Sequence, residues 1–564
     1  MTLKNKLNEA FNHDNIPEIE QLLNKYLLEY KDDYDKYSYL CNYHIISHNY
    51  TEALKFAKIA IHINPHCAEA NFNIAYVYDI MQDYSHAYLY YSILKMIQNR
   101  KHITCISETI LDERINYIRM RSDTDNTLQE AIIYADNYII YSSMDPFHSS
   151  ADIVGLPIMP DNNMYLCGRY NDSYNQFFAK NPPKNPYECK VEILQSLEKK
   201  YKQLIINEQF PCIVPIYSSL NNFENINISI NNKQDFVTPI SANNTWYYYR
   251  INEKTTFTAK EPIINSKPIS CKHHSNNKKL ILNIFIDSFS FRIFKLLSNN
   301  TNNIENISKL MPNTYNFFVK GIICTNAYVD SEWTTPSFSS YWTGKYSDKH
   351  MNLGSTIWFP FNIDTKLLPE YFEENGYLTA LINSNDACTP SKGYMRGINR
   401  ELYKASGYDK ESIITDTLEH LRAFKECDQF VTIEFQDLHD IAGYFPRQLS
   451  IQTTTDIQHL EIDNVFQSTV KQTRSLNKQQ LYMNELSQLD YYLGFLYDYI
   501  ENNYNPNEYI VSFFSDHGTA FMVDNSEFTI CKQRMNVPFM FRDNIHTGII
   551  DEIIQNVDYP AILC

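Results

Sequence analysis

Two aspartates and one histidine stand where a divalent metal ion could bind. Asp287 ends the apolar run LILNIFID, and Asp516 with His517 follows the apolar part of YIVSFFSDH. Carboxylate oxygens together with an imidazole nitrogen suit zinc, manganese or magnesium. We therefore predict one divalent metal ion held by Asp287, Asp516 and His517.

A hydroxyl-rich segment lies between these acidic positions. Residues 330–350 read DSEWTTPSFSSYWTGKYSDKH, and Pro336 restricts the backbone in their first half. A hydroxyl coordinated to a divalent cation loses its proton more easily and becomes a nucleophile. This segment is therefore expected to supply the group that the metal ion activates.

Six apolar runs with the character of buried strands carry these residues. They are residues 280–287, 321–330, 377–384, 429–437, 509–516 and 536–541. Amphipathic helical stretches lie between them, which indicates an α/β domain, residues 278–564, on a largely parallel sheet. Active sites in such sheets gather at the carboxyl ends of the strands. Asp287, Asp437 with His439, and Asp516 with His517 stand at those ends.

Three motifs in order resemble the sulfatase branch of the alkaline phosphatase superfamily, over residues 278–545. IFIDSFS matches the family's first strand with its terminal Asp, and SDHG, residues 515–518, matches the late Ser-Asp-[His/Asn]-Gly motif. TTPSFSSYWTGKY matches the nucleophile motif [Cys/Ser]-x-Pro-Ser-Arg followed by Thr-Gly-[Lys/Arg]-Tyr. The resemblance implies that Thr334 occupies the nucleophile position and also contacts the metal ion.

Departures from the sulfatase pattern indicate which branch of the superfamily this chain resembles. Thr334 replaces the Cys or Ser that a sulfatase oxidises to formylglycine, so sulfatase activity proper is not expected. Phe338 replaces the Arg of the motif, Ser288 replaces the second Asp of a pair, and Ser384 and Asp386 replace a Lys and a His. A Thr nucleophile with one metal ion and an Asp-His pair instead resembles phosphoethanolamine and phosphoglycerol transferases.

The resemblance implies transfer of a substituted phosphoryl group in two displacements. Thr334 attacks phosphorus and forms a phospho-threonine diester, which an acceptor hydroxyl then resolves. His439 is the candidate general acid and base, because EFQDLHDIAGYF resembles the family's Asp-Pro-His stretch, with Leu438 in place of Pro. Asp437 and Asp440 are alternative ligands for a second metal ion.

Three functions remain compatible with these motifs. The leading one is a metal-dependent transferase with a phosphodiester-type donor and a glycan-like hydroxyl acceptor, such as a capsule, another surface polysaccharide or its precursor. The second is a phosphate mono- or diester hydrolase, and the third is a non-catalytic, repeat-based interaction protein. Lys345 and Lys532 are candidate phosphate contacts, with an ordinary surface lysine as the alternative for each.

The N-terminal residues 1–140 have a 34-residue period. Tyr50 and Tyr84 are 34 residues apart, and so are Ala53 and Ala87. Small Ala side chains let two helices approach closely, so residues 15–100 resemble tetratricopeptide repeats, with an ordinary helical bundle as the alternative. Such repeats would hold a protein partner or brace another domain.

Residues 145–270 form a mixed middle region. The segment CKVEILQSLEKKYKQLI, residues 189–205, has helical spacing, and short alternating runs in residues 205–265 favour a small β-rich module. We find no chemistry there. The adjacent His273 and His274 in the following linker are expected to be solvated rather than metal-bound.

Composition excludes several other classes. The 564 residues contain 49 Lys+Arg and 66 Asp+Glu, and the net charge of −17 disfavours nucleic acid and anionic membranes as generic partners. Neither GxGxxG nor GxxxxGK[ST] occurs, so glycine-rich phosphate loops are not expected. Twelve scattered cysteines, no signal peptide and no membrane-spanning apolar run favour a cytoplasmic location, with peripheral association at the inner membrane face as the alternative.

Overall fold

The structure is a computed structural model of the 564-residue chain, and it divides into two compact units with separate apolar cores. The described residues are 2–13, 15–30, 33, 35–63, 67–101, 105–129, 131–132, 135–136, 153–155, 164–170, 190–196, 201–207, 210–218, 225–231, 233–239, 245–296, 303–350, 352–353, 365–385, 394–404, 408–443, 473–524, 526–528 and 530–563. The first unit is built from the helices before Asp145, and the second contains the sheets.

Consecutive helices of the first unit pack against one another. They are α1 (Leu3–Asn12), α2 (Ile16–Glu29), α3 (Asp35–Ile46), α4 (Tyr50–Ile63), α5 (Ala68–Ile80), α6 (Tyr84–Lys101) and α7 (Glu108–Arg121). Tyr50 begins α4 and Tyr84 begins α6, so the 34-residue spacing falls on equivalent positions of two helices. Ala53 and Ala87 are fully buried, which allows close approach of neighbouring helices. The predicted N-terminal helical region is confirmed.

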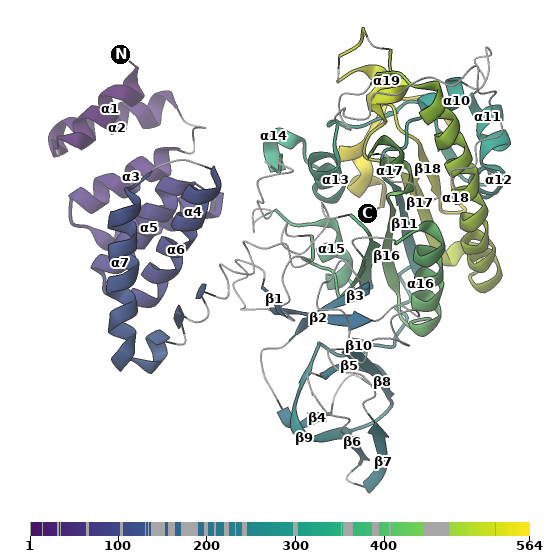
Figure 1. Cartoon of the computed structure of the whole chain (residues 1–564), viewed down its shortest axis with the longest axis horizontal. Coiled ribbons are helices and arrows are strands. Elements are labelled where there is room, and N and C mark those ends of the chain that lie inside the picture. Colours follow the sequence, from purple (N-terminus) through teal and green to yellow (C-terminus); the bar gives the residue numbers. More distant parts are fainter. Residues whose placement is uncertain are drawn as a thin grey trace. The chain divides into compact units, whose positions relative to one another are not determined.

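Eleven strands form the large sheet of the second unit (Figure 1). In spatial order they are β1 (Ile153–Gly155), β2 (Met164–Tyr170), β3 (Lys190–Ser196), β15 (Arg400–Tyr403), β14 (Leu378–Asn383), β16 (Gln429–Phe435), β11 (Leu280–Ile286), β17 (Tyr509–Phe514), β18 (Phe539–Arg542), β12 (Ile322–Cys324) and β19 (Gly548–Ile550). The strands from β15 to β17 run parallel, whereas β3 and β18 are antiparallel to them. The predicted α/β domain is confirmed.

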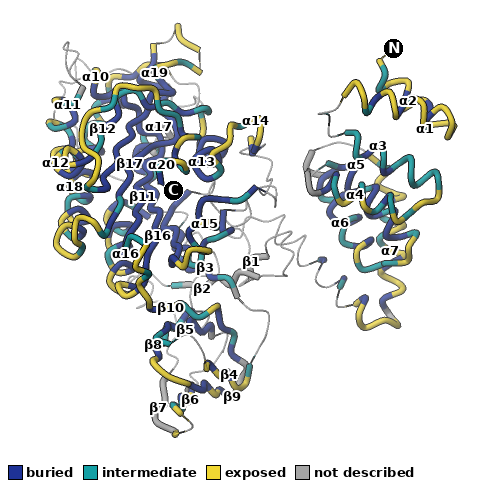
Figure 2. The backbone as a smooth tube through the Cα atoms, turned by 180° about the vertical axis from the view of Figure 1, so that it is seen from behind, coloured by how far each residue is buried: buried dark blue, intermediate teal, exposed yellow. Residues whose placement is uncertain are grey.

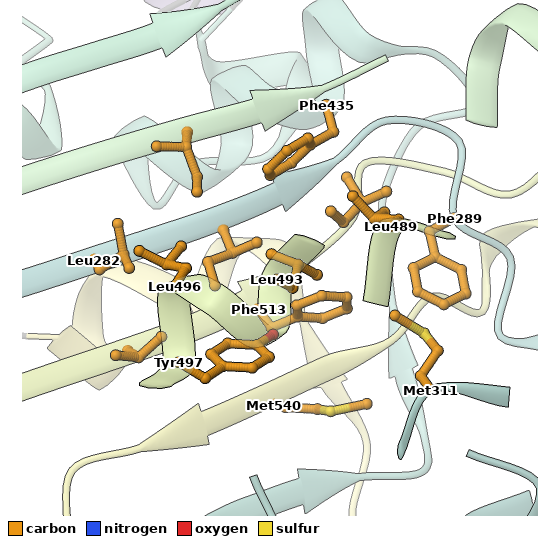
Figure 3. Close-up of a cluster of buried hydrophobic side chains, with 14 of the residues drawn as sticks. Leu282, Phe289, Met311, Phe435, Leu489, Leu493, Leu496, Tyr497, Phe513 and Met540 are labelled. Carbon is orange, nitrogen blue, oxygen red and sulfur yellow. The ribbon is translucent and has the colours of Figure 1, made fainter. Parts of the chain in front are cut away.

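Helices cover both faces of this sheet. They are α10 (Arg292–Leu296), α11 (Asn303–Leu310), α12 (Pro312–Phe318), α13 (Thr334–Thr343), α14 (Ser347–His350), α15 (Leu368–Glu374), α16 (Lys410–Ala423), α17 (Asp437–Gly443), α18 (Leu476–Asn503), α19 (Lys532–Met535) and α20 (Tyr559–Leu563). On one face, Leu489 and Leu493 of α18 join Leu282 of β11 in the main core (Figure 3). On the other, Phe338 of α13 stacks on Phe285 with ring centroids 4.8 Å apart. Leu282 and Phe285 serve opposite faces because side chains alternate along a strand.

Burial follows this layering (Figure 2). Every residue of β11, β14 and β16 is buried, as expected for parallel strands covered on both faces. Exposed positions lie mainly on the outer turns of the surrounding helices. Among the described helices, none combines the length and the apolar composition needed to span a bilayer.

A second sheet of seven strands forms the β-rich module. Its strands are β4 (Tyr201–Ile206), β5 (Cys212–Ser218), β6 (Asn225–Ile230), β7 (Lys233–Pro239), β8 (Thr245–Ile251), β9 (Thr255–Asn265) and β10 (Ile269–Ser270). Val214, Ile226 and Phe257 belong to its own apolar core. The predicted β-rich middle region is therefore confirmed, although β1, β2 and β3 from the same region belong to the large sheet.

The helix predicted for residues 189–205 is wrong. The segment forms β3 and β4, and β3 pairs on one side with β2 and on the other with β15. Val191 and Ile193 alternate with Glu192, and all three side chains are buried between neighbours. Pairing with two distant strands outweighs the helical preference of the Leu-, Glu- and Lys-rich segment.

The linker histidines contact a buried carboxylate. His273 Nδ1 lies 2.5 Å from Asp428 Oδ1, and His274 Nδ1 lies 3.1 Å from Asp428 Oδ2. Their side chains are 40% and 38% exposed, so both histidines contact solvent as well as this carboxylate. The expectation that they are solvated rather than metal-bound stays a prediction. The contacts attach the linker to the residue that precedes β16.

Candidate active site

Asp287 directly follows the central strand β11. Its backbone N–H donates to the Phe435 carbonyl at the end of β16, at 2.9 Å, so strand pairing extends to the aspartate. Ser288 then adopts a φ of 63°, a left-handed conformation that few residues other than glycine adopt. This turn directs the Ser288 N–H to Asp516 Oδ1, at 3.0 Å. The backbone thus fixes the two aspartates relative to each other.

Asp516 and His517 follow β17 at the same edge of the sheet. Asp516 Oδ1 accepts the N–H of His517 at 2.9 Å, whereas the buried Oδ2 has no hydrogen-bond partner among the described residues. His517 Nδ1 lies 3.1 Å from the Gly518 carbonyl and acts as the donor, so in the neutral ring Nε2 keeps its lone pair. That Nε2 lies 3.4 Å from Asp516 Oδ2 and 3.8 Å from Asp287 Oδ1.

These three side chains bring acceptor atoms together in a buried place. One ligand atom from each of Asp287, Asp516 and His517 lies within 4.8 Å of the other two. Burial, and secondly the charge of Asp516, raise the pKa of Asp287 to about 8. Close carboxylates that share a buried site repel each other, and a cation removes that repulsion. The donor set and the unpaired Oδ2 of Asp516 therefore fit a divalent metal ion.

Thr334 is the first residue of α13 and faces this cluster. Its hydroxyl donates to Asp287 Oδ2 at 3.3 Å, and only 9% of the residue is exposed. The N-cap residue of α13 is Trp333, whose side chain makes no capping hydrogen bond. The N–H groups of the first helical turn and the positive end of the helix dipole favour an anion beside Thr334.

The far end of α13 accounts for the Thr-Gly pair of the motif. Gly344 ends the helix with a φ of 63°, and its N–H donates to the Ser340 carbonyl at 2.9 Å. Thr343 Oγ1 donates to the Ser339 carbonyl at 2.7 Å. The ten residues of α13 span about 15 Å. Lys345 is exposed and follows the far end of this helix, and its predicted contact with phosphate stays a prediction.

Comparison with protein families identifies this part of the chain. The model of the sulfatase family matches residues 279–560, which is half of the chain. The chain belongs to the sulfatase family. The match includes the ends of β11 and β17 and the whole of α13, so the resemblance predicted from the three motifs is confirmed.

Solved structures similar to the sulfatase-family domain come from several bacteria. A protein of the alkaline phosphatase superfamily from Vibrio parahaemolyticus is 16% identical, with a TM-score of 0.37, over 51% of this chain and 66% of that one. The lipoteichoic acid synthase LtaP from Listeria monocytogenes is 14% identical, with a TM-score of 0.36, over 51% and 71%. The phosphonate monoester hydrolase from Silicibacter pomeroyi is 12% identical, with a TM-score of 0.35, over 50% and 71%. Similarity this low transfers no activity.

A comparison with curated proteins gave no match. The chemistry of this sulfatase-family member therefore has to be argued from its own side chains.

Sequence reasoning missed Asn385. It follows β14, two strands away from β11, and its side-chain amide donates to Asp287 Oδ2 at 2.9 Å. The neighbouring Ser384 donates to Glu434 Oε2 through its backbone N–H at 3.0 Å and through its hydroxyl at 3.3 Å. Asp386 lies outside the described residues. Its position directly after a predicted buried strand could have indicated that Asn385 lies near the site.

Arg534 of α19 is a second residue that sequence reasoning missed. It is 3% exposed, its carbonyl accepts the Gly518 N–H at 2.8 Å, and its Nη2 donates to the Glu332 carbonyl at 3.0 Å. Burial lowers the pKa of Arg534, and the charges of Glu332 and Asp516 oppose that shift. A buried guanidinium therefore lies between the segments that carry Thr334 and Asp516.

The predicted general acid lies on α17, which starts beside the end of β11. His439 is half-buried, and its role stays a prediction. Asp437 faces Lys410, with Oδ1 3.3 Å from Nζ, and Lys410 also contacts Glu485. The other oxygen of Asp437, Oδ2, is buried without a hydrogen-bond partner among the described residues, so a second metal ion at Asp437 stays a prediction. The side chain of Asp440 lies outside the described residues.

Lys532 begins α19 and is exposed. Its Nζ lies 5.7 Å from the ring centroid of Tyr328. Burial, and then the charges of Lys532 and Arg292, lower the pKa of Lys295, so these three cations lie near one another. The predicted contact of Lys532 with phosphate stays a prediction.

Proposed function

We propose that this sulfatase-family domain is a metal-dependent transferase. It moves a substituted phosphoryl group through a phospho-Thr334 intermediate to an acceptor hydroxyl, on a glycan or glycan precursor of the cell surface. The observation that carries the proposal is the contact of the Thr334 hydroxyl with Asp287 Oδ2, inside the buried cluster with Asp516 and His517.

The residues around Thr334 argue against sulfate chemistry. Oxidation of the secondary alcohol of Thr334 would give a ketone, so the aldehyde hydrate of a sulfatase cannot form there. Phe338, at the position of the motif's Arg, is fully buried and stacks on Phe285. A phosphoryl centre needs neither feature, because the Thr334 oxygen can attack phosphorus directly.

In the first displacement, Asp287 Oδ2 orients the Thr334 hydroxyl. A divalent ion held by Asp287, Asp516 and His517 would lower the pKa of the hydroxyl and neutralise charge on a phosphoryl oxygen. The Thr334 hydroxyl passes its proton to Asp287 Oδ2 as its oxygen forms a bond to phosphorus, and the bond to the donor's alcohol breaks. His439 gives the leaving oxygen its proton. The first-turn N–H groups of α13 donate to phosphoryl oxygens, where charge accumulates.

In the second displacement, His439 takes the proton of the acceptor hydroxyl. The acceptor oxygen forms the new bond to phosphorus, and the bond to Thr334 breaks as Asp287 returns the proton to the Thr334 oxygen. A hydrolase would differ only in the acceptor, which would be water. The helical repeats are proposed to hold a protein partner of this reaction, since repeat stacks offer extended binding surfaces.

Intact-mass measurement with bis(p-nitrophenyl) phosphate and added divalent ions tests the proposal. Attack by Thr334 expels p-nitrophenolate and leaves a p-nitrophenyl phosphoryl group on the protein. Thr335→Ala is the matched control, because Thr335 is the next residue of the same helix and is also buried. The adduct should form in wild type and in Thr335→Ala and be absent in Thr334→Ala. Turnover without any adduct on wild type, even after rapid quenching, would contradict the covalent route.

The acceptor is tested by adding glycerol or methyl glycosides to the same reaction. Products that carry the p-nitrophenyl phosphoryl group on the added alcohol support a transferase. Release of p-nitrophenyl phosphate alone, at every alcohol concentration, supports the hydrolase.

A further inference from the structure

A cavity of about 420 Å³ lies where the β-rich module meets the large sheet. Its lining comes from β2, β3 and β15 of the large sheet, from β5 and β8 of the module and from α16. This volume is typical of small-molecule sites, which measure about 300–1,000 Å³. Arg400 in its wall begins β15, whereas Asp287 follows the end of the parallel strand β11. The cavity and the candidate active site therefore lie at opposite edges of the sheet.

The buried charges in the wall are paired. Glu192 Oε1 accepts from Arg400 Nε at 2.5 Å and from the Tyr248 hydroxyl at 2.6 Å. Lys190 Nζ donates to Asp416 Oδ1 at 2.7 Å. The lining residues contain as many cations as anions, namely Lys190, Arg250 and Arg400 against Glu192, Asp416 and Glu419. A wall with no net charge favours a neutral ligand over a phosphate or a carboxylate.

The wall nevertheless retains hydrogen-bonding capacity. Arg400 Nη1 donates to His420 Nδ1 at 2.8 Å, and a guanidinium has five N–H donors, so donors remain after its contacts with His420 and Glu192. His420 is 1% exposed, and its Nε2 has no hydrogen-bond partner among the described residues. A buried donor without an acceptor is unfavourable, by about 1–3 kcal/mol. A ligand oxygen would satisfy it, directly or through a water molecule.

Four aromatic side chains also line the cavity. Tyr170, Trp246, Tyr248 and Phe424 are all part of it. An apolar ring face can stack on such side chains, while Tyr hydroxyls and charged groups bond to polar substituents. A purely apolar ligand would leave the donors of Arg400 unpaired.

From this combination we propose that the cavity binds a neutral, hydroxyl-rich ring, namely one sugar unit of a glycan. The site is separate from the metal cluster, and its occupancy does not require the chain to be a transferase. It would hold a glycan at the module while another part of the polymer remains free.

Binding is tested on the full-length chain with the methyl glycosides of glucose, galactose and N-acetylglucosamine. Saturation-transfer NMR detects binding, and tryptophan fluorescence reports on Trp246, one of four tryptophans in the chain. At least one glycoside should bind, with a fluorescence change that is lost in Trp246→Phe. Absence of binding by all three at millimolar concentration would overturn the proposal.

Substitutions on α16 locate the site. Ala423 lines the cavity and is exposed, so Ala423→Phe should fill the cavity without disturbing the buried ion pairs. Thr415→Phe places the same side chain at an exposed position of α16 outside the lining. The affinity should fall by at least about tenfold in Ala423→Phe and not in Thr415→Phe.

If Ala423→Phe does not fold, Arg250→Ala at the exposed rim replaces it and should also weaken binding. Unchanged affinity in the folded cavity variant would mean that the sugar binds elsewhere, and would overturn the assignment. Competition by inorganic phosphate for the same site would overturn the neutral ligand class.

Discussion

Asparagine in place of Asp516 would remove a metal ligand at nearly constant shape. Asp516 Oδ1 accepts the N–H groups of Ser288 and His517 at 3.0 and 2.9 Å. An asparagine carbonyl can keep both bonds, whereas its NH₂ group takes the place of Oδ2 and cannot bind a cation. We therefore expect Asp516→Asn to fold and to lose its divalent metal ion.

In the absence of metal, the same substitution should stabilise the protein. Burial, and secondly the charge of Asp516, raise the pKa of Asp287 to about 8. Without that charge the pKa of Asp287 should fall back towards its ordinary value, so the chelated variant should be more stable than chelated wild type at neutral pH. In wild type, a metal ion at a thousand times its dissociation constant adds about 4 kcal/mol of stability, and this gain should be absent from the variant.

Thermal unfolding with a chelator, and with added zinc, manganese or magnesium, measures both effects. Asp490→Asn is the control, because Asp490 is also buried but accepts the backbone N–H groups of Asn313 and Thr314 at 2.9 and 2.7 Å. It should lower the melting temperature equally with and without metal. If added metal raises the melting temperature of Asp516→Asn as much as that of wild type, the ligand assignment is wrong. A chelated variant less stable than chelated wild type would refute the electrostatic reasoning.

Four further outcomes are expected. Thr334→Ala should lose at least about a thousandfold in turnover and Thr334→Ser should keep part of it, and rates near wild type in the Ala variant would exclude covalent catalysis. His439→Gln should slow donors with poor leaving groups by about 10²–10⁴-fold and p-nitrophenyl esters much less, and equal losses would argue against a general acid. Metal-free wild type should lose stability as pH rises from about 4 to 8 in denaturation curves, because the unfolded chain releases the Asp287 proton first. A chain that starts at residue 146 should keep its metal content and its turnover of p-nitrophenyl esters. A chain that starts at residue 271 lacks β2 and β3 and should not fold, which circular dichroism would show.

The metal ligands could be predicted because each depends on a local pattern. Asp287, Asp516 and His517 follow uninterrupted apolar runs, and the carboxyl ends of adjacent parallel strands lie at one edge of a sheet. The α/β fold followed from the same runs. The contact between Thr334 and Asp287 could be predicted only from the family motif, because no local pattern relates the start of a helix to the end of β11.

The remaining site residues depend on backbone details that no local pattern encodes. Asn385 reaches Asp287 through the turn after β14, and Ser288 reaches Asp516 only because its φ is positive. Arg534 lies in a segment of four helical residues, too short for a periodic signal. Each contact joins residues that are distant in sequence or depends on one dihedral angle.

The misassigned segment at residues 189–205 shows the same limit in the fold. As a helix, this segment could have left Glu192 in water, which is where an isolated glutamate is most stable. As strand β3, it buries Glu192, and burial of that charge is tolerable only because Arg400 pairs with it from 208 residues away. The partner strand β15 was itself not predicted, so nothing local favoured the strand. The same ion pair forms part of the wall of the proposed sugar cavity, which is why a region that showed no chemistry in sequence can still contain a binding site.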